Sequence, residues 1–148
     1  MSAPLGPVAR ECVEGYLYSS PPLRVLVFRR PPVRGGFWVP ISGKVERGDA
    51  GLEAALGREL SEETGLPPTT PVESLDWHVP FRVDNGETWR LHAYAVRVAP
   101  GFQPRLSDEH DAFAWVTPTE AIERLHFPDN AEAVRRLVRR QGPVAPNV

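Results

Sequence analysis

The stretch GKVERGDAGLEAALGRELSEETGL, residues 43–66, holds the clearest pattern in this chain of 148 residues. It predicts a helix over residues 50–64 on which Glu59, Glu62 and Glu63 stand at i, i+3 and i+4. That spacing brings the three carboxylates to one sector of the helix surface. Oxygen-rich clusters of this kind suit Mg²⁺, which takes a few carboxylates together with phosphate oxygens and water. The pattern therefore predicts a divalent metal site carried by one helix.

These acids lie close to the apolar side of the predicted helix. At about 100° per residue, Leu52, Leu56 and Leu60 span a sector of about 80° on the helix surface. Glu63 falls inside this sector, and Glu59 and Glu62 fall on its border. Carboxylates are rarely buried unless they are paired or bound to a cation, and the one charge of Arg58 cannot neutralise three acids. A solvated acidic face, the usual explanation of a Glu-rich helix, fits this pattern less well. The side expected to face solvent carries Ala54, Gly57, Arg58 and Ser61.

This stretch resembles the Nudix box, whose consensus is G-x5-E-x7-R-E-U-x-E-E-x-G-U, with U an aliphatic residue. The matching positions are Gly43, Arg58, Glu59, Leu60, Glu62, Glu63, Gly65 and Leu66. Asp49 stands where the consensus has Glu, and the spacer between Asp49 and Arg58 is one residue longer than usual. Both departures lie in the loop and the first helical turn, where an extra residue is easily absorbed. The chain is thus similar to the Nudix hydrolases of the MutT type.

The resemblance implies roles for the residues of the box. Glu59 and Glu63 are expected to bind Mg²⁺ or Mn²⁺, and Glu62 to act as a ligand or as a base that positions water. Gly43 resembles a glycine whose neighbourhood offers a backbone carbonyl to the metal, and that carbonyl is expected to belong to Ser42. The catalytic set implied in this way is Arg58, Glu59, Glu62 and Glu63, with Arg58 orienting a glutamate.

A further metal-binding carboxylate often comes from a loop outside the box in this family. The candidates are Asp108, Glu109 and Asp111, and Glu109 is preferred. Glu109-His110 followed by an aromatic-rich strand with Trp115 resembles the bacterial dATP and dihydroneopterin triphosphate pyrophosphohydrolases. A solvated acidic loop is the alternative.

The expected substrate contacts lie on both sides of a loop over residues 31–36. Arg29 and Arg30 end a predicted strand, and arginine suits bidentate binding of phosphate. Trp38, Trp77, Phe81 and Trp89 are candidates for stacking on a base, with core packing the alternative for each. The substrate-binding set is therefore Arg29, Arg30, Trp38 and Ser42. The four histidines show no paired ligand spacing, so a zinc site is not expected.

Strand and helix signals alternate along the chain. Strands are expected at residues 11–18 and 23–28 around a Ser-Ser-Pro-Pro turn, at 75–83 and 88–98 around Asp84-Asn85-Gly86, and at 112–116. Asp49 is expected to cap the helix over residues 50–64 and Gly65 to end it. A Thr117 capping box opens a second helix, and Asp129 with Glu132 opens a third that buries Ala133, Val134, Leu137 and Val138.

This order of elements predicts a single α/β domain, an α/β/α sandwich of the Nudix type with a mixed sheet between helices. The domain is expected to span residues 11–140, between mobile tails at 1–10 and 141–148. A net charge of −2 does not favour nucleic-acid binding, and no apolar run has the length of a membrane span. The single Cys12 fits a reducing cytoplasm. Monomer and homodimer both stay open.

The expected activity is Mg²⁺-dependent cleavage of a phosphoanhydride bond in a nucleoside diphosphate linked to a group X. The first candidate is a nucleoside triphosphate, giving monophosphate and pyrophosphate. Dinucleoside polyphosphates, ADP-ribose and nucleotide sugars are the alternatives. Pro80 resembles a proline associated with ADP-ribose hydrolases, although an edge-strand proline explains it more simply. A Nudix module that senses a nucleotide without cleaving it, or a purely structural domain, is the alternative outside enzymes.

Overall fold

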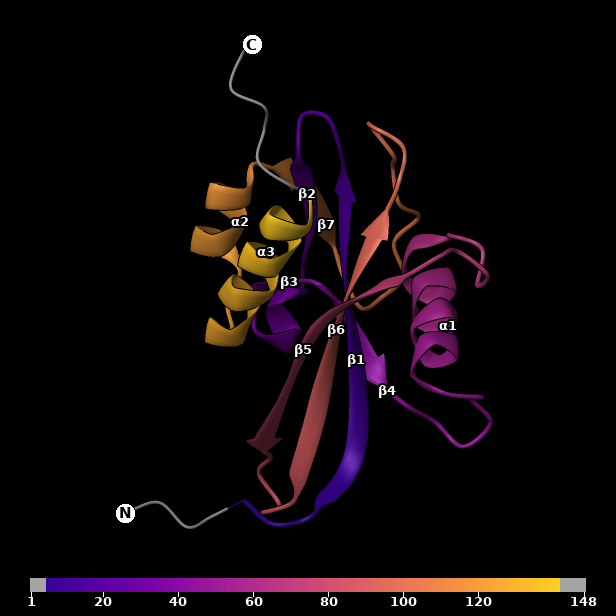
Figure 1. The fold of residues 1–148 in the computed structure, drawn as a ribbon, viewed down its shortest axis with the longest axis vertical. Helices are drawn as coiled ribbons and strands as arrows, with labels where there is room; N and C mark the ends of the chain where they lie inside the picture. The colour runs from indigo at the N-terminus through magenta and orange to yellow at the C-terminus, as the bar shows by residue number, and fades with distance from the viewer. Residues whose placement is uncertain (1–4, 142–148) are drawn as a thin grey trace.

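A computed structural model describes residues 5–141 of the chain, and Figure 1 gives the arrangement of its elements. They follow in the order β1 (Val8–Ser19), β2 (Arg24–Arg29), a 3-10 turn η1 (Pro32–Arg34), β3 (Trp38–Val39), β4 (Ile41–Lys44), α1 (Leu52–Thr64), β5 (Glu73–Arg82), β6 (Thr88–Arg97), β7 (Ala112–Val116), α2 (Pro118–Arg124) and α3 (Pro128–Arg140). No helix within the described residues is long and apolar enough to cross a membrane.

The sheet is mixed and is organised around β1. The strand β1 is long enough to pair antiparallel with both β2 and β4, at different points along its length. It also pairs parallel with β6. The predicted hairpins β1–β2 and β5–β6 are both present, and β7 adds to β2. β4 was not expected, because the four residues Ile41–Lys44 are too short to carry a strand pattern of their own.

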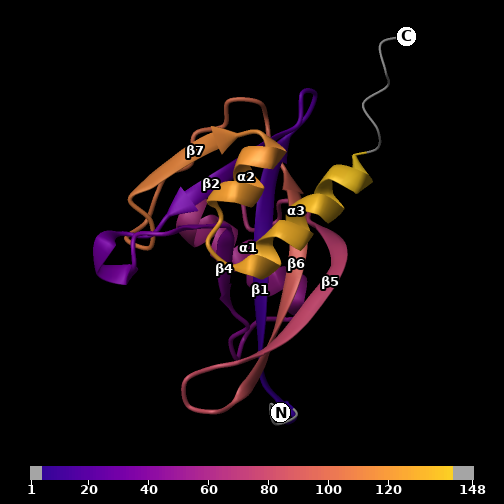
Figure 2. The same cartoon turned by 90° about the vertical axis from the view of Figure 1, so that its left-hand side faces the viewer.

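Helices cover both faces of the sheet, as Figures 1 and 2 show: α1 lies on one face, and α2 with α3 on the other. Alternate residues of β1 point to opposite faces. Val13 and Leu17 pack with Leu60 of α1, while Tyr16 packs with Leu137 of α3. The expected α/β/α sandwich with a mixed sheet is therefore confirmed.

The sequence predicts the carboxyl-terminal end of α1 correctly but not its amino-terminal cap. Gly65 ends the helix in the left-handed conformation, with φ 82°, as expected. The expected cap by Asp49 is wrong, because Gly51 occupies the N-cap position and no side chain caps the helix there. The Asp49 carboxylate instead binds Arg58, since charge-assisted bonds to a guanidinium are stronger than a bond to one backbone N–H.

The start of the chain and its last helix also depart from expectation. β1 begins at Val8, so residues 8–10 continue the strand rather than belong to a tail. Pro128 opens α3 one residue before the expected Asp129 cap, and the side chain of Asn130 accepts the Phe127 N–H. Val138, expected in the core, is 37% exposed because it lies at the edge of the helix stripe. Residues 1–4 and 142–148 lie outside the described part of the chain.

Candidate active site

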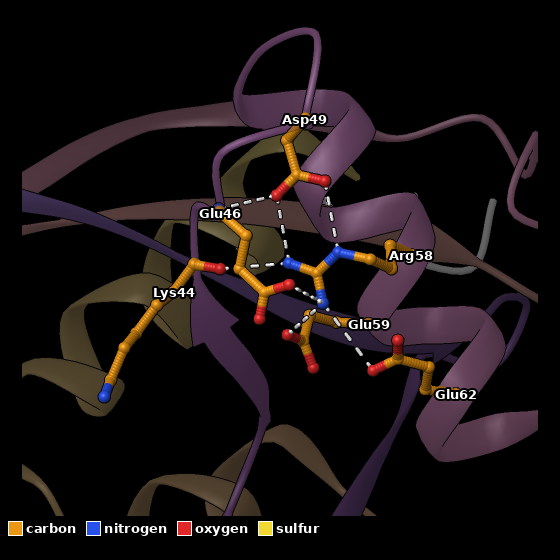
Figure 3. Close-up of polar contacts among 6 residues, drawn as sticks. All are labelled: Lys44, Glu46, Asp49, Arg58, Glu59 and Glu62. Atoms are coloured by element: carbon orange, nitrogen blue, oxygen red, sulfur yellow. Dashed lines mark hydrogen bonds and ion pairs between the residues drawn. The ribbon is translucent and has the colours of Figure 1, made fainter.

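Arg58 is the centre of the polar contacts at the amino-terminal side of α1 (Figure 3). Its Nε and Nη2 donate to the two carboxylate oxygens of Asp49 at 3.1 and 3.0 Å, and Nη2 also donates to the Lys44 carbonyl at 3.0 Å. Its Nη1 donates to Glu59 Oε1 at 2.9 Å. The shorter Asp49, after a longer spacer, therefore still holds the guanidinium in a two-point contact. Arg58 in turn fixes one oxygen of Glu59.

Glu63 is the buried carboxyl of α1. The residue is 5% exposed, and its Oε2 is buried without a hydrogen-bond partner among the described residues. Burial, together with the nearby charges of Glu59, Glu109 and Glu62, raises the pKa of Glu63 to about 9, although Arg30 acts to lower it. A buried carboxyl with an unpartnered oxygen among other acids is the environment that a cation would neutralise.

Glu59 lies against the strand β4. Its side chain is 12% exposed, and burial raises the pKa of its carboxyl despite the bond to Arg58. A Cβ on Gly43 would lie 2.2 Å from Oε1 of Glu59, so only glycine leaves room for this carboxylate at β4. Gly43 therefore lies against the side chain of Glu59. The helical geometry expected for Glu59 and Glu63 is confirmed as well.

Glu62 differs from the other two acids because its side chain is 59% exposed. It lies 3.6 Å from Arg58 Nη1, and Glu46 lies 3.7 Å from the same atom. Within residues 5–141 no three His, Cys, Asp or Glu side chains are already grouped as a metal site. The acids of α1 are thus neighbours on the helix, and their side chains would have to move closer together to bind one cation.

The acidic loop before β7 forms ion pairs with the strand and turn that precede β3. Glu109 binds Arg34 Nη1 at 2.8 Å, and Asp111 binds Arg29 Nε at 2.8 Å. Asp108 is exposed. Of the three candidates, Glu109 alone is among the charges that raise the pKa of Glu63. This places Glu109 within electrostatic reach of the helix acids.

A cavity of about 390 Å³ lies beside β4, on the sheet face that carries α2 and α3. Arg30 and Ser42, two of the expected substrate contacts, line it together with Gly43. Arg29 and Trp38 do not line it: Trp38 packs against the core, and the guanidinium of Arg29 lies over its ring. Of the candidate stacking residues, Phe81 and Trp89 reach the cavity, whereas Trp77 packs against the core.

A divalent cation fits the chemistry of this site. The acids of α1 offer carboxylate oxygens, which hard cations prefer. Glu63 offers an unpartnered buried oxygen, and glycine at position 43 leaves space beside Glu59. Both observations come from the part of the chain that the box covers.

Several residues of the site are not apparent from the sequence pattern. Glu14, Lys44 and Asn130 line the cavity, and Arg34 pairs with Glu109 from 75 residues away. Glu14 had one usable signal, a lone acid inside an apolar strand segment. The Arg34–Glu109 pair had none, because only tertiary folding brings those residues together. Gly57, expected on the solvent side of α1, is buried against Pro68.

Curated relatives match most of the chain. Over 119 residues it is 43% identical to the octanoyltransferase of Myxococcus xanthus, a match that covers 78% of this chain and 32% of that protein. It is 36% identical over 103 residues to the CTP pyrophosphohydrolase of Escherichia coli, covering 68% of this chain and 71% of that enzyme. The chain thus spans about a third of the Myxococcus protein, whose name describes the whole protein.

The fold is similar to that of the E. coli dihydroneopterin triphosphate pyrophosphohydrolase. The TM-score is 0.77 at 19% identity, over 90% of this chain and 99% of that one. The NUDIX domain profile matches residues 16–139, which include the end of β1, the box and all but the last residue of α3. The chain belongs to the NUDIX domain family.

Proposed function

We propose that this protein is a metal-dependent pyrophosphohydrolase that converts a nucleoside triphosphate to a monophosphate and pyrophosphate. The observation that carries the proposal is Glu63 of α1, a buried carboxyl near the charge of Glu59, with one oxygen that has no hydrogen-bond partner within residues 5–141. In the reaction, the oxygen of water forms a bond to phosphorus and the phosphoanhydride bond breaks. One proton of water passes to a base, and the leaving phosphate takes the electron pair.

The metal-binding residues in this proposal are Glu59, Glu63, Glu62 and Glu109, together with the backbone near Gly43. Mg²⁺ is the expected ion, and Mn²⁺ would suit the same oxygen ligands. When bound, the cation neutralises phosphate charge and so allows a nucleophile to approach. Glu109 would leave Arg34 to join the helix acids, a movement that its side-chain exposure of 47% permits.

Protein groups supply the remaining steps. Glu62, exposed and held only by the 3.6 Å ion pair with Arg58, is the proposed base that takes the proton from water, because a base must reach solvent and substrate. Arg58 holds Glu59 in place and is itself held by Asp49. This arrangement orients the acids before substrate binds, which reduces the entropic cost of reaching the transition state.

The substrate would place its nucleoside in the cavity and its phosphates toward the helix acids. The cavity has the volume expected of a small-molecule site. Arg30 and Lys44 line it and supply positive charge for phosphate oxygens, and Ser42, directly before the box, lines it as well. Arg29 and Trp38, outside the cavity, are proposed to contact the phosphates at the rim rather than the base.

One of the two curated relatives named above supports a triphosphate as the substrate. The E. coli relative is a CTP pyrophosphohydrolase. The chain would accordingly have a small nucleotide as its partner. We propose the cytoplasm as its compartment, because Cys12 is a free, buried thiol of the kind that reducing compartments preserve.

The test is product analysis by chromatography with Mg²⁺ across triphosphates, dinucleoside polyphosphates, ADP-ribose and nucleotide sugars. Monophosphate plus pyrophosphate from triphosphates, with little product elsewhere, is the expected result. ATP plus AMP from diadenosine tetraphosphate would assign the chain to dinucleoside polyphosphates instead. Nucleotide-dependent melting without any product would indicate a sensing module.

A further inference from the structure

Arg30 directly follows β2 and differs from the two arginines nearest to it in the sequence. Arg29 is paired with Asp111 and Arg34 with Glu109, each at 2.8 Å. The side chain of Arg30, by contrast, forms no hydrogen bond and no ion pair with any residue between positions 5 and 141. Arg30 therefore keeps its charge and its N–H donors available to a ligand.

Two aromatic rings hold the guanidinium of Arg30 instead. Its central carbon lies 5.7 Å from the ring centroid of Phe37 and 5.7 Å from that of Phe127. Phe37 lies just before β3 and Phe127 just before α3, so the rings approach Arg30 from two separate segments. A cation within about 6 Å of a ring centroid is attracted to the ring face. The rings thus orient the guanidinium without occupying its N–H groups, which a carboxylate would occupy.

The ring of Phe37 is itself held in place by its neighbours. It stacks on the ring of His126 with 3.9 Å between centroids and 13° between planes, and it meets the ring of Phe127 edge to face at 6.1 Å. The Arg30 N–H donates to the Phe37 carbonyl at 2.9 Å, which ties the two residues together through the backbone. A Cβ on Gly35 would lie 2.2 Å from the Phe37 ring, so glycine at position 35 leaves the space that this ring fills.

Arg30 lies where the cavity beside β4 approaches the acids of α1. It lines the cavity, and its charge also reaches Glu63, whose pKa it acts to lower. Phe37 is not among the residues that line the cavity, so it would not touch a nucleoside bound there. An effect of Phe37 on the reaction would therefore have to act through Arg30.

We propose that Phe37 is a positioning residue that, together with Phe127, holds Arg30 toward the phosphates of the bound nucleotide. This inference rests on the proposed function and deepens it. The planar fork of arginine N–H groups matches the oxygens of a phosphate. An arginine that is oriented before the ligand arrives loses less side-chain freedom on binding, so more of its attraction appears as affinity.

The first test is a double-mutant cycle of Phe37→Leu and Arg30→Gln, with kcat/KM measured for GTP and Mg²⁺. In the wild-type background, Phe37→Leu should lower kcat/KM by about 5-fold or more, because the ring face is lost. The loss should lie mainly in KM, because Arg30 contacts phosphate already in the bound substrate. In the Arg30→Gln background, the same change should alter kcat/KM by less than about 2-fold. An equal loss in both backgrounds would overturn the proposal.

Phe102→Leu is the matched control, because it makes the same exchange at a half-buried phenylalanine that packs on the core beside α1. Its kcat/KM should stay close to wild type. The exposed ring of Phe127 provides a second comparison, because Phe127→Tyr keeps the ring face and Phe127→Leu removes it. Only the leucine variant should raise KM, and only while Arg30 is present. Equal KM values for the two variants would contradict the proposal, even if Phe37→Leu does not fold.

Calorimetric binding of α,β-methylene-GTP with Mg²⁺ separates this inference from the proposed function, because the analogue cannot be cleaved between its α- and β-phosphates. If the protein cleaves no triphosphate but binds the analogue less tightly in Phe37→Leu than in wild type, the proposed activity fails while the role of Phe37 stands. If the protein cleaves triphosphates and Phe37→Leu binds the analogue as tightly as wild type, the role of Phe37 fails alone.

Discussion

Burial of Glu63 in α1 carries a large electrostatic cost. Its carboxyl is buried near Glu59, Glu62 and Glu109, whereas the side chain of Glu62 reaches solvent. In the folded protein without metal, Glu63 holds its proton up to a pKa of about 9, against an ordinary value of 4.5. A bound cation would displace that proton, so metal binding and proton loss are coupled at this residue.

The pH dependence of metal-free stability tests this cost. The folded state binds more protons than the unfolded state between about pH 4.5 and 9, so stability should fall as pH rises through that window. Glu63→Gln removes the ionisation. In EDTA its melting temperature should match wild type near pH 4.5 and exceed it at pH 8.5 by about 3 °C or more.

Glu62→Gln is the matched control, because it makes the same chemical change at an exposed position of the same helix. Its melting temperature should follow wild type much more closely across the pH range. A difference between Glu63→Gln and wild type that stays constant with pH would show that the ionisation of Glu63 does not oppose folding.

At the scale of elements, the contact between β4 and α1 positions the acids. Gly43 of β4 touches the carboxyl end of Glu59, which is flexible, whereas Gly57 on the other side of α1 touches the backbone carbonyl of Pro68. A Cβ would come within 2.2 Å of the neighbouring atom at either position. The consequences differ, because a side-chain end can move away and a backbone carbonyl cannot do so cheaply.

Gly43→Ala is expected to impair activity while the fold stays intact. The new methyl group displaces the Glu59 carboxylate, and a shift of about 1 Å in a catalytic group can cost about 100-fold in rate. We expect turnover of the nucleoside triphosphate to fall by about 10-fold or more, with a melting temperature close to wild type. Gly51→Ala, where a Cβ meets nothing within 4 Å, is the control. Full activity in Gly43→Ala would exclude the close packing of Glu59 on β4.

Gly57→Ala should have the opposite profile, a loss of stability. Alanine gains about 1 kcal/mol over glycine in a helix interior, but overpacking typically costs about 1–3 kcal/mol. Because the clash is with backbone, we expect the cost to exceed the gain and thermal unfolding to occur at lower temperature. A higher melting temperature than wild type would mean that the Pro68 segment moves aside freely.

Features of α1 that depend on local helical geometry could be predicted from the sequence, whereas features that depend on contacts with other segments could not. Helical periodicity correctly placed Glu59 and Glu63 toward the core, because the period depends only on local geometry. Asp49 was taken for a cap because a local pattern does not show a competing arginine nine residues along the chain. Gly57 was placed in solvent because its contact, Pro68, lies in a loop whose path the helix pattern does not determine.

At the scale of the whole molecule, the sandwich brings the two parts of the proposed site, the acids of α1 and the cavity, together from opposite faces of the sheet. The acids of α1 lie on one face, and the cavity lies on the face of α2 and α3. They meet at β4, where Gly43 lines the cavity and touches Glu59. The family and the layered fold could be predicted from one short motif and the order of elements, and both are confirmed.

The cavity could not be predicted in the same way. It is built from β1, β4, the β5–β6 hairpin and the start of α3, which only the tertiary fold brings together. Asn130, which lines it, donates a hydrogen bond to the Tyr16 hydroxyl across 114 positions of sequence. The cavity therefore depends on long-range contacts, whereas the proposed metal-binding part lies mainly within one continuous stretch.

The most direct test of the proposed activity is pyrophosphate release from GTP with saturating Mg²⁺, measured for wild type, Glu62→Gln and Glu63→Gln. Circular dichroism establishes that each variant is folded. Wild type should release pyrophosphate, EDTA should abolish the release, and each variant should lose about 100-fold or more, as expected when a residue of the reacting site is removed. Release by both folded variants at the wild-type rate would contradict a catalytic role for the α1 acids.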